Sequence, residues 1–306
     1  MKTQIRKKYD DENGEENQMV KPKLKSVAVT VPLPVVGTTQ EITWCPGCPN
    51  FLVLAAWKNA LTNLIKQGYL QENFAMCAGI GCHPKIYDYL NISGVYGLHG
   101  RVLPVCLGMK LGNPNLKVLG FSGDGDAYAE GMEHFIHAAR YNADITYFVA
   151  NNQSFALTTG QSTPTSAKGF KSKAEPDGEY NMPLNPIKLA LAAGASFVAR
   201  INPKDIPHTQ EIIEKAIKHK GFAFIESIQD CLIFDQNPGR DKLMYKIDNG
   251  KDMKKAMEIA DSWDYNSKTA KIPIGIIYQE EKPILEEKWP QLRKLRDNKI
   301  SWKNSK

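Results

Sequence analysis

Short apolar runs alternate with longer segments of helical periodicity over most of the chain. The apolar runs predict buried strands at 74–79, 117–122, 145–150, 196–200, 222–228 and 273–279. Segments with apolar residues at helical spacing predict helices at 50–68, 102–112, 127–141, 186–195 and 205–219. Because strands and helices alternate, we expect an α/β fold built on a doubly wound parallel sheet.

The pattern also divides the chain into three parts. Residues 1–40 carry no strong periodicity, and we expect a mobile or extended segment there. Residues 41–240 hold most of the predicted elements and form the expected main domain. Residues 241–306 are more charged, and we expect a C-terminal extension that packs on this domain or on a partner subunit.

Charge and hydropathy exclude several classes of protein. No apolar run reaches the length of a membrane span, and the first residues lack the apolar core of a secretory signal. We therefore expect a cytoplasmic protein without a membrane partner. The net charge of the 306 residues is +6, but the basic residues are scattered. This distribution argues against nucleic-acid binding and suits an acidic protein partner better.

Polar loops follow two of the predicted strands. Asp124 lies between Gly123 and Gly125 directly after the strand at 117–122, and the pair Asn151 and Asn152 follows the next strand. The carboxyl ends of parallel strands form the edge of a sheet where ligands bind. Carboxylate and amide oxygens suit Mg²⁺, and glycine lets the backbone approach a phosphate. This spacing resembles the thiamine-diphosphate signature; the alternative is an ordinary turn at a strand end.

Six cysteines in a chain of this size do not predict a disulfide scaffold. Cys77 and Cys106 lie inside apolar segments and are expected to be packing residues. The other four lie at predicted strand ends or in loops; they are Cys45, Cys48, Cys82 and Cys231. Four thiolates suit either a tetrahedral zinc ion or an iron–sulfur cluster. Beside a thiamine-diphosphate signature the cluster is favoured, because it would take electrons from the carbanion chemistry of that cofactor.

Over about residues 41–280 the chain resembles a known family, the β subunits of 2-oxoacid:ferredoxin oxidoreductases. The segments that carry the resemblance are WCPGC (44–48), GIGC (79–82), LHGRVLPVCLGMKL (98–111), GDGD (123–126), NNQSFALTTGQSTPT (151–165) and the stretch around Cys231. The resemblance implies a sheet of the thiamine-diphosphate-binding type with a C-terminal extension.

The resemblance also implies the residues of the site. One [4Fe–4S] cluster would be held by Cys45, Cys48, Cys82 and Cys231. Mg²⁺ would be held by Asp124, Asn152 and the backbone carbonyl of Ser154. Contacts to thiamine diphosphate would come from Ile80, Gly81, Cys82, His83, His99, Gly125, Asp126, Ala156, Leu157 and Gln236. Lys85, Leu157 and Thr159 would lie near the substrate.

The implied activity is oxidative decarboxylation of a 2-oxo acid with coenzyme A, which gives an acyl-CoA and CO₂ and passes electrons through the cluster to ferredoxin. An α (or α and γ) subunit would supply the pyrimidine-binding and coenzyme A-binding parts. Two other functions stay open: a non-oxidative thiamine-diphosphate decarboxylase, and an electron-transfer subunit stabilised by zinc or a cluster.

Two residues depart from the family pattern. Pro49 stands where the family has glycine, and proline is compatible with the start of a helix. Thr159 stands where several members carry a lysine that could meet a distal substrate carboxylate. We therefore expect pyruvate or another neutral 2-oxo acid to be preferred over 2-oxoglutarate.

Overall fold

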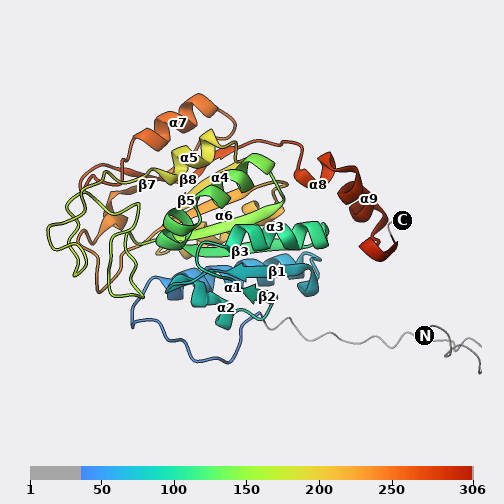
Figure 1. Cartoon of the computed structure of the whole chain (residues 1–306), viewed down its shortest axis with the longest axis horizontal. Helices are drawn as coiled ribbons and strands as arrows, with labels where there is room; N and C mark the ends of the chain where they lie inside the picture. The colour runs from blue at the N-terminus through green and yellow to red at the C-terminus, as the bar shows by residue number, and fades with distance from the viewer. Residues whose placement is uncertain (1–35, 305–306) are drawn as a thin grey trace, which may run out of the picture. The chain divides into compact units, whose positions relative to one another are not determined.

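The computed structural model describes residues 36–304, and their core is one eight-stranded sheet (Figure 1). The strand order is β2-β1-β3-β4-β6-β5-β8-β7, and every neighbouring pair is parallel except β5 and β8. The strands are β1 (Phe74–Ala78), β2 (Ser93–Tyr96), β3 (Lys117–Gly123), β4 (Ile145–Asn151), β5 (Phe197–Ile201), β6 (Ala223–Ile228), β7 (Met244–Asp248) and β8 (Ile272–Gln279). The expected α/β class and doubly wound sheet are confirmed, with one antiparallel pairing that the sequence pattern did not predict.

Helices cover both faces of this sheet. They are α1 (Asn50–Lys66), α2 (Ile86–Tyr89), α3 (Val102–Gly112), α4 (Met132–Tyr141), α5 (Pro186–Ala192), α6 (Ile206–Lys218), α7 (Met253–Asp261), α8 (Leu285–Lys288) and α9 (Pro290–Asn298). Apolar residues of α1 and α6 pack in the core on one face, and those of α3, α4, α5 and α7 pack on the other. Phe148 and Tyr147, adjacent on β4, belong to opposite cores, as expected for a central strand buried on both sides.

The structure differs from the predicted elements mainly at the edges of the sheet. β2 and β7 were not predicted, and both are partly exposed edge strands without a continuous apolar run. The helix predicted from residue 127 is instead two elements, a π-helical turn at Asp126–Glu130 followed by α4. Such turns occur frequently at functional sites.

The parallel strands β1, β3, β4 and β6 all end at one edge of the sheet. The segments that follow them are therefore neighbours in space although they are far apart in sequence. They are Gly79–His83, Asp124–Asp126, Asn152–Ser154 and Gln229–Cys231. These segments contain most of the residues that the sequence singled out.

The C-terminal residues join the same sheet. β8 pairs with β5 and with β7, so residues 244–279 extend the sheet beyond β5. Lys110 of α3 connects the chain end to the core, because its buried Nζ donates to the carbonyls of Pro114 (2.9 Å) and Leu116 (2.8 Å) and lies 3.4 Å from Glu286 of α8. The domain boundaries near residues 40 and 240 stay predictions, and residues 1–35 lie outside the described part.

In residues 36–304 we find no helix that combines the length and apolar character needed to cross a membrane.

Replacement of Lys110 by methionine should destabilise the chain by about 3 kcal/mol, because Glu286 is buried and would lose its cation. Burial already raises the pKa of Glu286, and the charge of Lys110 opposes this effect. The double variant Lys110→Met/Glu286→Gln should recover part of the loss. Urea unfolding midpoints of the three proteins measure this, and a double variant less stable than Lys110→Met would contradict the assignment.

Candidate active site

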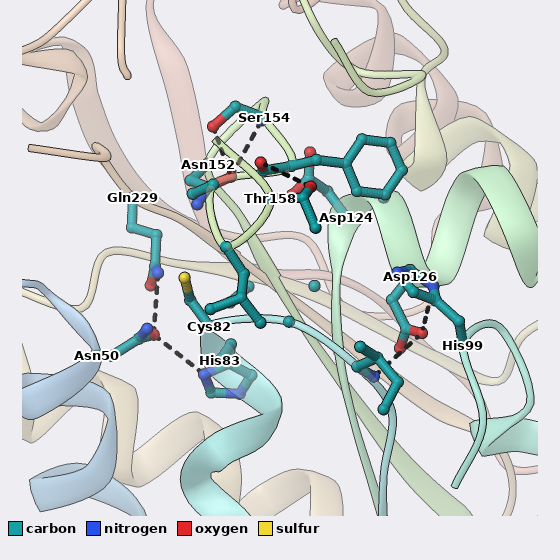
Figure 2. Close-up of a pocket in the computed structure, with 18 residues that line it drawn as sticks. Asn50, Cys82, His83, His99, Asp124, Asp126, Asn152, Ser154, Thr158 and Gln229 are labelled. Carbon is teal, nitrogen blue, oxygen red and sulfur yellow. Dashed lines mark hydrogen bonds and ion pairs between the residues drawn. The ribbon is translucent and has the colours of Figure 1, made fainter. Parts of the chain in front are cut away.

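A cavity opens at the carboxyl edge of the sheet, where β1, β3, β4 and β6 end (Figure 2). Twelve of the site residues predicted from the sequence line this cavity. They are Ile80, Gly81, Cys82, His83, His99, Asp124, Gly125, Asp126, Asn152, Ser154, Ala156 and Leu157. The sheet thus brings residues that lie more than 70 positions apart in the sequence into one cavity.

Asp124 is one of two buried acids that line this cavity, with Asp126, and only 2 % of the residue is exposed. Its Oδ2 accepts hydrogen bonds from the hydroxyls of Thr163 (2.6 Å) and Thr165 (3.1 Å). Burial raises the pKa of Asp124 to about 6, and the two hydroxyls oppose this effect. A buried carboxylate of this kind is stabilised by a cation, because its negative charge is otherwise poorly solvated.

The two asparagines after β4 have different environments. Asn151 is fully buried, and its Nδ2 donates to Glu226 Oε1 at 2.9 Å. Asn152 lines the cavity, and its Oδ1 accepts from the backbone N–H of Ser154 at 3.0 Å. Asn151 is therefore a structural residue, whereas Asn152 and Ser154 can present oxygen atoms to a ligand.

Asp126 connects three loops on the other side of the cavity. Its Oδ1 accepts from the backbone N–H of Gly100 at 2.7 Å. The same oxygen lies 3.1 Å from Nδ1 of His99, as drawn in Figure 2. Contact with Asp126 raises the pKa of His99. A Cβ at Gly79 would collide with the Asp126 carboxylate, so a side chain at that position is excluded.

Asn50, His83 and Gln229 form a buried polar group beside Cys82 (Figure 2). Asn50 Oδ1 accepts from His83 Nδ1 (3.1 Å) and from Gln229 Nε2 (3.0 Å). Burial lowers the pKa of His83 to about 3, so the ring is neutral at physiological pH. The roles of Asn50 and Gln229 were not predicted. Asn50 follows the pair Cys45 and Cys48, Gln229 follows a predicted strand, and no sequence motif indicates a function for either residue.

A second cavity adjoins the first and contains all four cysteines of the predicted cluster. Cys45, Cys48, Cys82 and Cys231 line it, together with Lys85. The pKa of Cys48 is raised to about 11, mainly by burial and to a smaller extent by the other three thiols. The thiols are free, and no group of three or more potential ligands in residues 36–304 has the geometry of a preformed metal site.

The two cavities share a wall. Cys82, Asn152, Ala156 and Leu157 line both of them, as do Asn50 and Gln229. Cys77 and Cys106 lie elsewhere, fully buried in the core between β1 and α3, as predicted for packing residues.

Three predicted site residues have positions that the motifs did not indicate. Thr159 is exposed, has a φ of 78° and lies outside both cavities, whereas its neighbour Thr158 lines the first one. Gln236 also lies outside both, and its amide is hydrogen-bonded to the backbone of Lys171. Lys85 lines the cysteine cavity, where its Nζ donates to Thr43 Oγ1 at 2.9 Å.

The glycines of the GDGD segment act differently from each other. A Cβ at Gly125 would collide with the ring of Phe155, which also lines the cavity. A Cβ at Gly123 would meet no atom within 4 Å, and this residue also lines the cavity. Gly123 therefore leaves room for a ligand, whereas Gly125 is required by packing.

Two protein families match the chain in tandem. Residues 79–227 match the family described as thiamine pyrophosphate enzyme, C-terminal TPP binding domain. Residues 241–294 match the C-terminal family of the pyruvate ferredoxin oxidoreductase beta subunit. The first match contains the GDGD segment and the asparagine pair.

Similar proteins and a solved structure agree with these families. The chain is 40 % identical over 255 residues to the 2-oxoacid:ferredoxin oxidoreductase subunit beta of Saccharolobus solfataricus, which covers 78 % of this chain and 82 % of that protein. It is 42 % identical over 188 residues to the 2-oxoglutarate synthase subunit KorB of Archaeoglobus fulgidus, and this match covers 61 % of this chain and 69 % of that protein.

The solved structure is a 2-oxoglutarate:ferredoxin oxidoreductase from Magnetococcus marinus with 2-oxoglutarate, coenzyme A and succinyl-CoA bound. It superposes with a TM-score of 0.78 at 31 % identity and covers 86 % of this chain and 89 % of the matched chain. With the geometry of the two cavities, these similarities show that the chain belongs to the family of β subunits of 2-oxoacid:ferredoxin oxidoreductases.

Proposed function

We propose that the chain binds thiamine diphosphate with Mg²⁺ in the first cavity and a [4Fe–4S] cluster in the second. In this role it is the β subunit for coenzyme A-dependent oxidative decarboxylation of a 2-oxo acid, with electrons passed to ferredoxin. The observation that carries the proposal is the shared wall: the four thiols line a cavity that meets the cofactor cavity at Cys82.

The first cavity fits a diphosphate with its metal ion. Asp124, Asn152 and the carbonyl of Ser154 supply the hard oxygen atoms that Mg²⁺ prefers. A cation at Asp124 would also offset the burial of its carboxylate, which otherwise raises the pKa of this group. The open space at Gly123 leaves room for the phosphate oxygens.

The second cavity fits a cluster held by thiolates. Its four cysteines come from three separate segments, so the fold and not local sequence brings them together. Cys48 lies at the start of α1, where the N–H of Asn50 lowers the pKa of its thiol against the larger effect of burial. Ligation by iron would remove the cost of the buried thiolates, because the positive metal compensates their charge.

When bound, thiamine diphosphate supplies a site that stabilises negative charge on the keto carbon of a 2-oxo acid. The residues of this chain bind and orient the reactants around it. The neutral ring of His83 and the amides of Asn50 and Gln229 form a polar wall without net charge beside Cys82. His99 contacts Asp126, and the raised pKa of His99 makes it a candidate hydrogen-bond donor to the diphosphate.

A partner subunit is expected to complete the site. Ile80 and Leu157 line the first cavity and are nevertheless exposed, and Leu98, next to His99, has 75 % of its surface exposed. Exposed apolar residues at the mouth of a cavity are typical of a surface that another chain covers. The pyrimidine-binding and coenzyme A-binding parts would come from this partner.

The preferred 2-oxo acid stays a prediction. Neither lysine nor arginine is among the residues that line the first cavity, which favours a substrate without a distal carboxylate, such as pyruvate. Thr159 is exposed on the loop beside the cavity. A lysine at this position would meet a substrate carboxylate only if its side chain pointed into the cavity. The named relatives include both general 2-oxoacid and 2-oxoglutarate enzymes.

The two other functions weighed from the sequence are less well supported. A non-oxidative decarboxylase needs no electron acceptor, so nothing in its chemistry calls for four thiols next to the cofactor cavity. A zinc-stabilised electron-transfer subunit would not need the buried Asp124 and Asn152 in a cavity that adjoins the cysteines.

Replacement of Asp124 by asparagine should abolish tight binding of thiamine diphosphate, because the anionic metal ligand is lost while the fold is kept. Asp144→Asn is the control, since Asp144 precedes β4 at the opposite edge of the sheet. Calorimetric titration of the assembled enzyme with thiamine diphosphate and Mg²⁺ provides the measurement. Cofactor affinity in Asp124→Asn equal to that of the unchanged protein would refute the metal assignment.

Replacement of Cys231 by alanine should remove the cluster, whereas Cys106→Ala should retain it. Cys231 lines the second cavity, and Cys106 lies in the apolar core. Iron content and visible absorption of anaerobically purified proteins test this expectation. Full iron content in Cys231→Ala would disprove the ligand set, and zinc in place of iron in the unchanged protein would disprove the cluster.

A further inference from the structure

Two threonine hydroxyls meet the same oxygen of Asp124. Thr163 Oγ1 lies 2.6 Å and Thr165 Oγ1 lies 3.1 Å from Asp124 Oδ2. Both threonines belong to the long loop after β4, and both are buried. The two threonines therefore reach Asp124 without lining the first cavity themselves.

The directions of these hydrogen bonds follow from counting protons. Each hydroxyl has one proton to donate. The hydroxyl of Ser166 donates to the carbonyl of Gln153 at 2.6 Å, so toward Thr163 it can only accept. A carboxylate can only accept, and Asp124 Oδ2 is the nearest acceptor to Thr163 Oγ1. Thr163 therefore donates to Asp124.

Thr165 has three possible acceptors, Asp124 Oδ2 at 3.1 Å, Asn151 Oδ1 at 3.0 Å and the neutral hydroxyl of Thr163 at 3.2 Å. Asn151 Oδ1 already accepts from the backbone N–H of Gln153 at 3.0 Å. Hydrogen bonds to an ionised acceptor are stronger than those between neutral groups. The proton of Thr165 is therefore directed to Asp124 when this carboxyl is ionised.

A buried ion pair fixes the orientation of Asn151. Glu226 Oε2 accepts from Arg200 Nε at 3.0 Å and from the hydroxyl of Tyr265 at 2.5 Å. Glu226 Oε1 can only accept, so Asn151 must present its Nδ2 there and its Oδ1 to Thr165. Arg200 and Glu226 are fully buried, and such a pair persists only when its remaining groups are hydrogen-bonded.

We propose that Thr163 and Thr165 are positioning residues for the divalent cation: they bind Asp124 Oδ2 and thereby present Oδ1 to the metal. The chain Arg200–Glu226–Asn151 fixes the position of Asn151 Oδ1, the acceptor that competes with Asp124 for the proton of Thr165. This inference rests on the proposed function, because it requires that Asp124 is a metal ligand.

Replacement of Thr165 by valine tests the inference, because valine keeps the shape and removes the hydroxyl. We expect the dissociation constant for Mn²⁺, used as the probe at saturating thiamine diphosphate, to rise about tenfold, the loss expected when a charged acceptor loses one hydrogen bond. The double variant Thr163→Val/Thr165→Val should bind Mn²⁺ more weakly still. Thr165→Ser should bind like the unchanged protein, since it restores the hydroxyl.

The experiment uses the full chain assembled with its partner subunit and counts free Mn²⁺ by electron paramagnetic resonance. Thr146→Val is the matched control, since it removes a buried hydroxyl of β4 that donates to the carbonyl of Ala216 instead. Thermal unfolding of each protein without metal separates lost stability from lost metal binding.

Each outcome has one meaning. Weaker Mn²⁺ binding in Thr165→Val, with Thr165→Ser and Thr146→Val unchanged, supports the inference. Mn²⁺ binding in Thr165→Val equal to that of the unchanged protein overturns it. Equal weakening in Thr165→Ser and Thr165→Val, or a loss that follows the unfolding temperature, also overturns it. Failure of the unchanged protein to bind Mn²⁺ with thiamine diphosphate would instead reject the proposed function on which the inference rests.

Discussion

The parallel pairing of β1, β3, β4 and β6 is the constraint on which the chemistry of this chain depends. Parallel strands bring the residues that follow them to one edge of the sheet, whatever their separation in the sequence. Asp124, Asn152 and Cys82 reach one cavity for this reason, and Cys231 follows β6 into the adjoining one. A different order of these strands would keep each sequence motif intact but would place these side chains far from one another.

Burial gives these groups their chemical character. The carboxylate of Asp124 and the thiol of Cys48 are both poorly solvated, and their pKa values are raised for this reason. His83 is held neutral by the same effect. A site of this kind favours metal cations at its anionic groups, since the cation supplies the stabilisation that water would otherwise provide. The buried ion pair between Arg200 and Glu226 belongs to the same arrangement, because Asn151 donates to Glu226 and accepts from the backbone N–H of Gln153 in the loop after β4.

Much of the fold could be predicted, because the central strands are buried on both faces and appear as continuous apolar runs. β3 and β4 were placed to within about one residue for this reason. β2 and β7 were missed because edge strands are partly exposed and their residues are mixed. The antiparallel turn of β8 onto β5 has no local signal, since the direction of a strand is decided by the whole sheet.

The candidate site, like the fold, contains residues that the sequence predicted and residues that it missed. Asp124 and the four cysteines carry chemistry in their residue type, so their place at predicted strand ends or in loops was enough to single them out. Thr163, Thr165, Asn50 and Gln229 are common polar residues whose role comes only from what they touch. Thr159 and Gln236 were placed by resemblance to the family, and here they lie outside both cavities.

In the proposed function, the first cavity and the cysteine cavity act together in one oxidation. The most direct measurement is single-turnover electron paramagnetic resonance of the anaerobic assembled enzyme, mixed with 2-oxo acid and coenzyme A without ferredoxin. We expect a reduced iron–sulfur signal to appear within one turnover and to be lost when thiamine diphosphate is removed. Release of CO₂ with no reduced cluster at any time would contradict it.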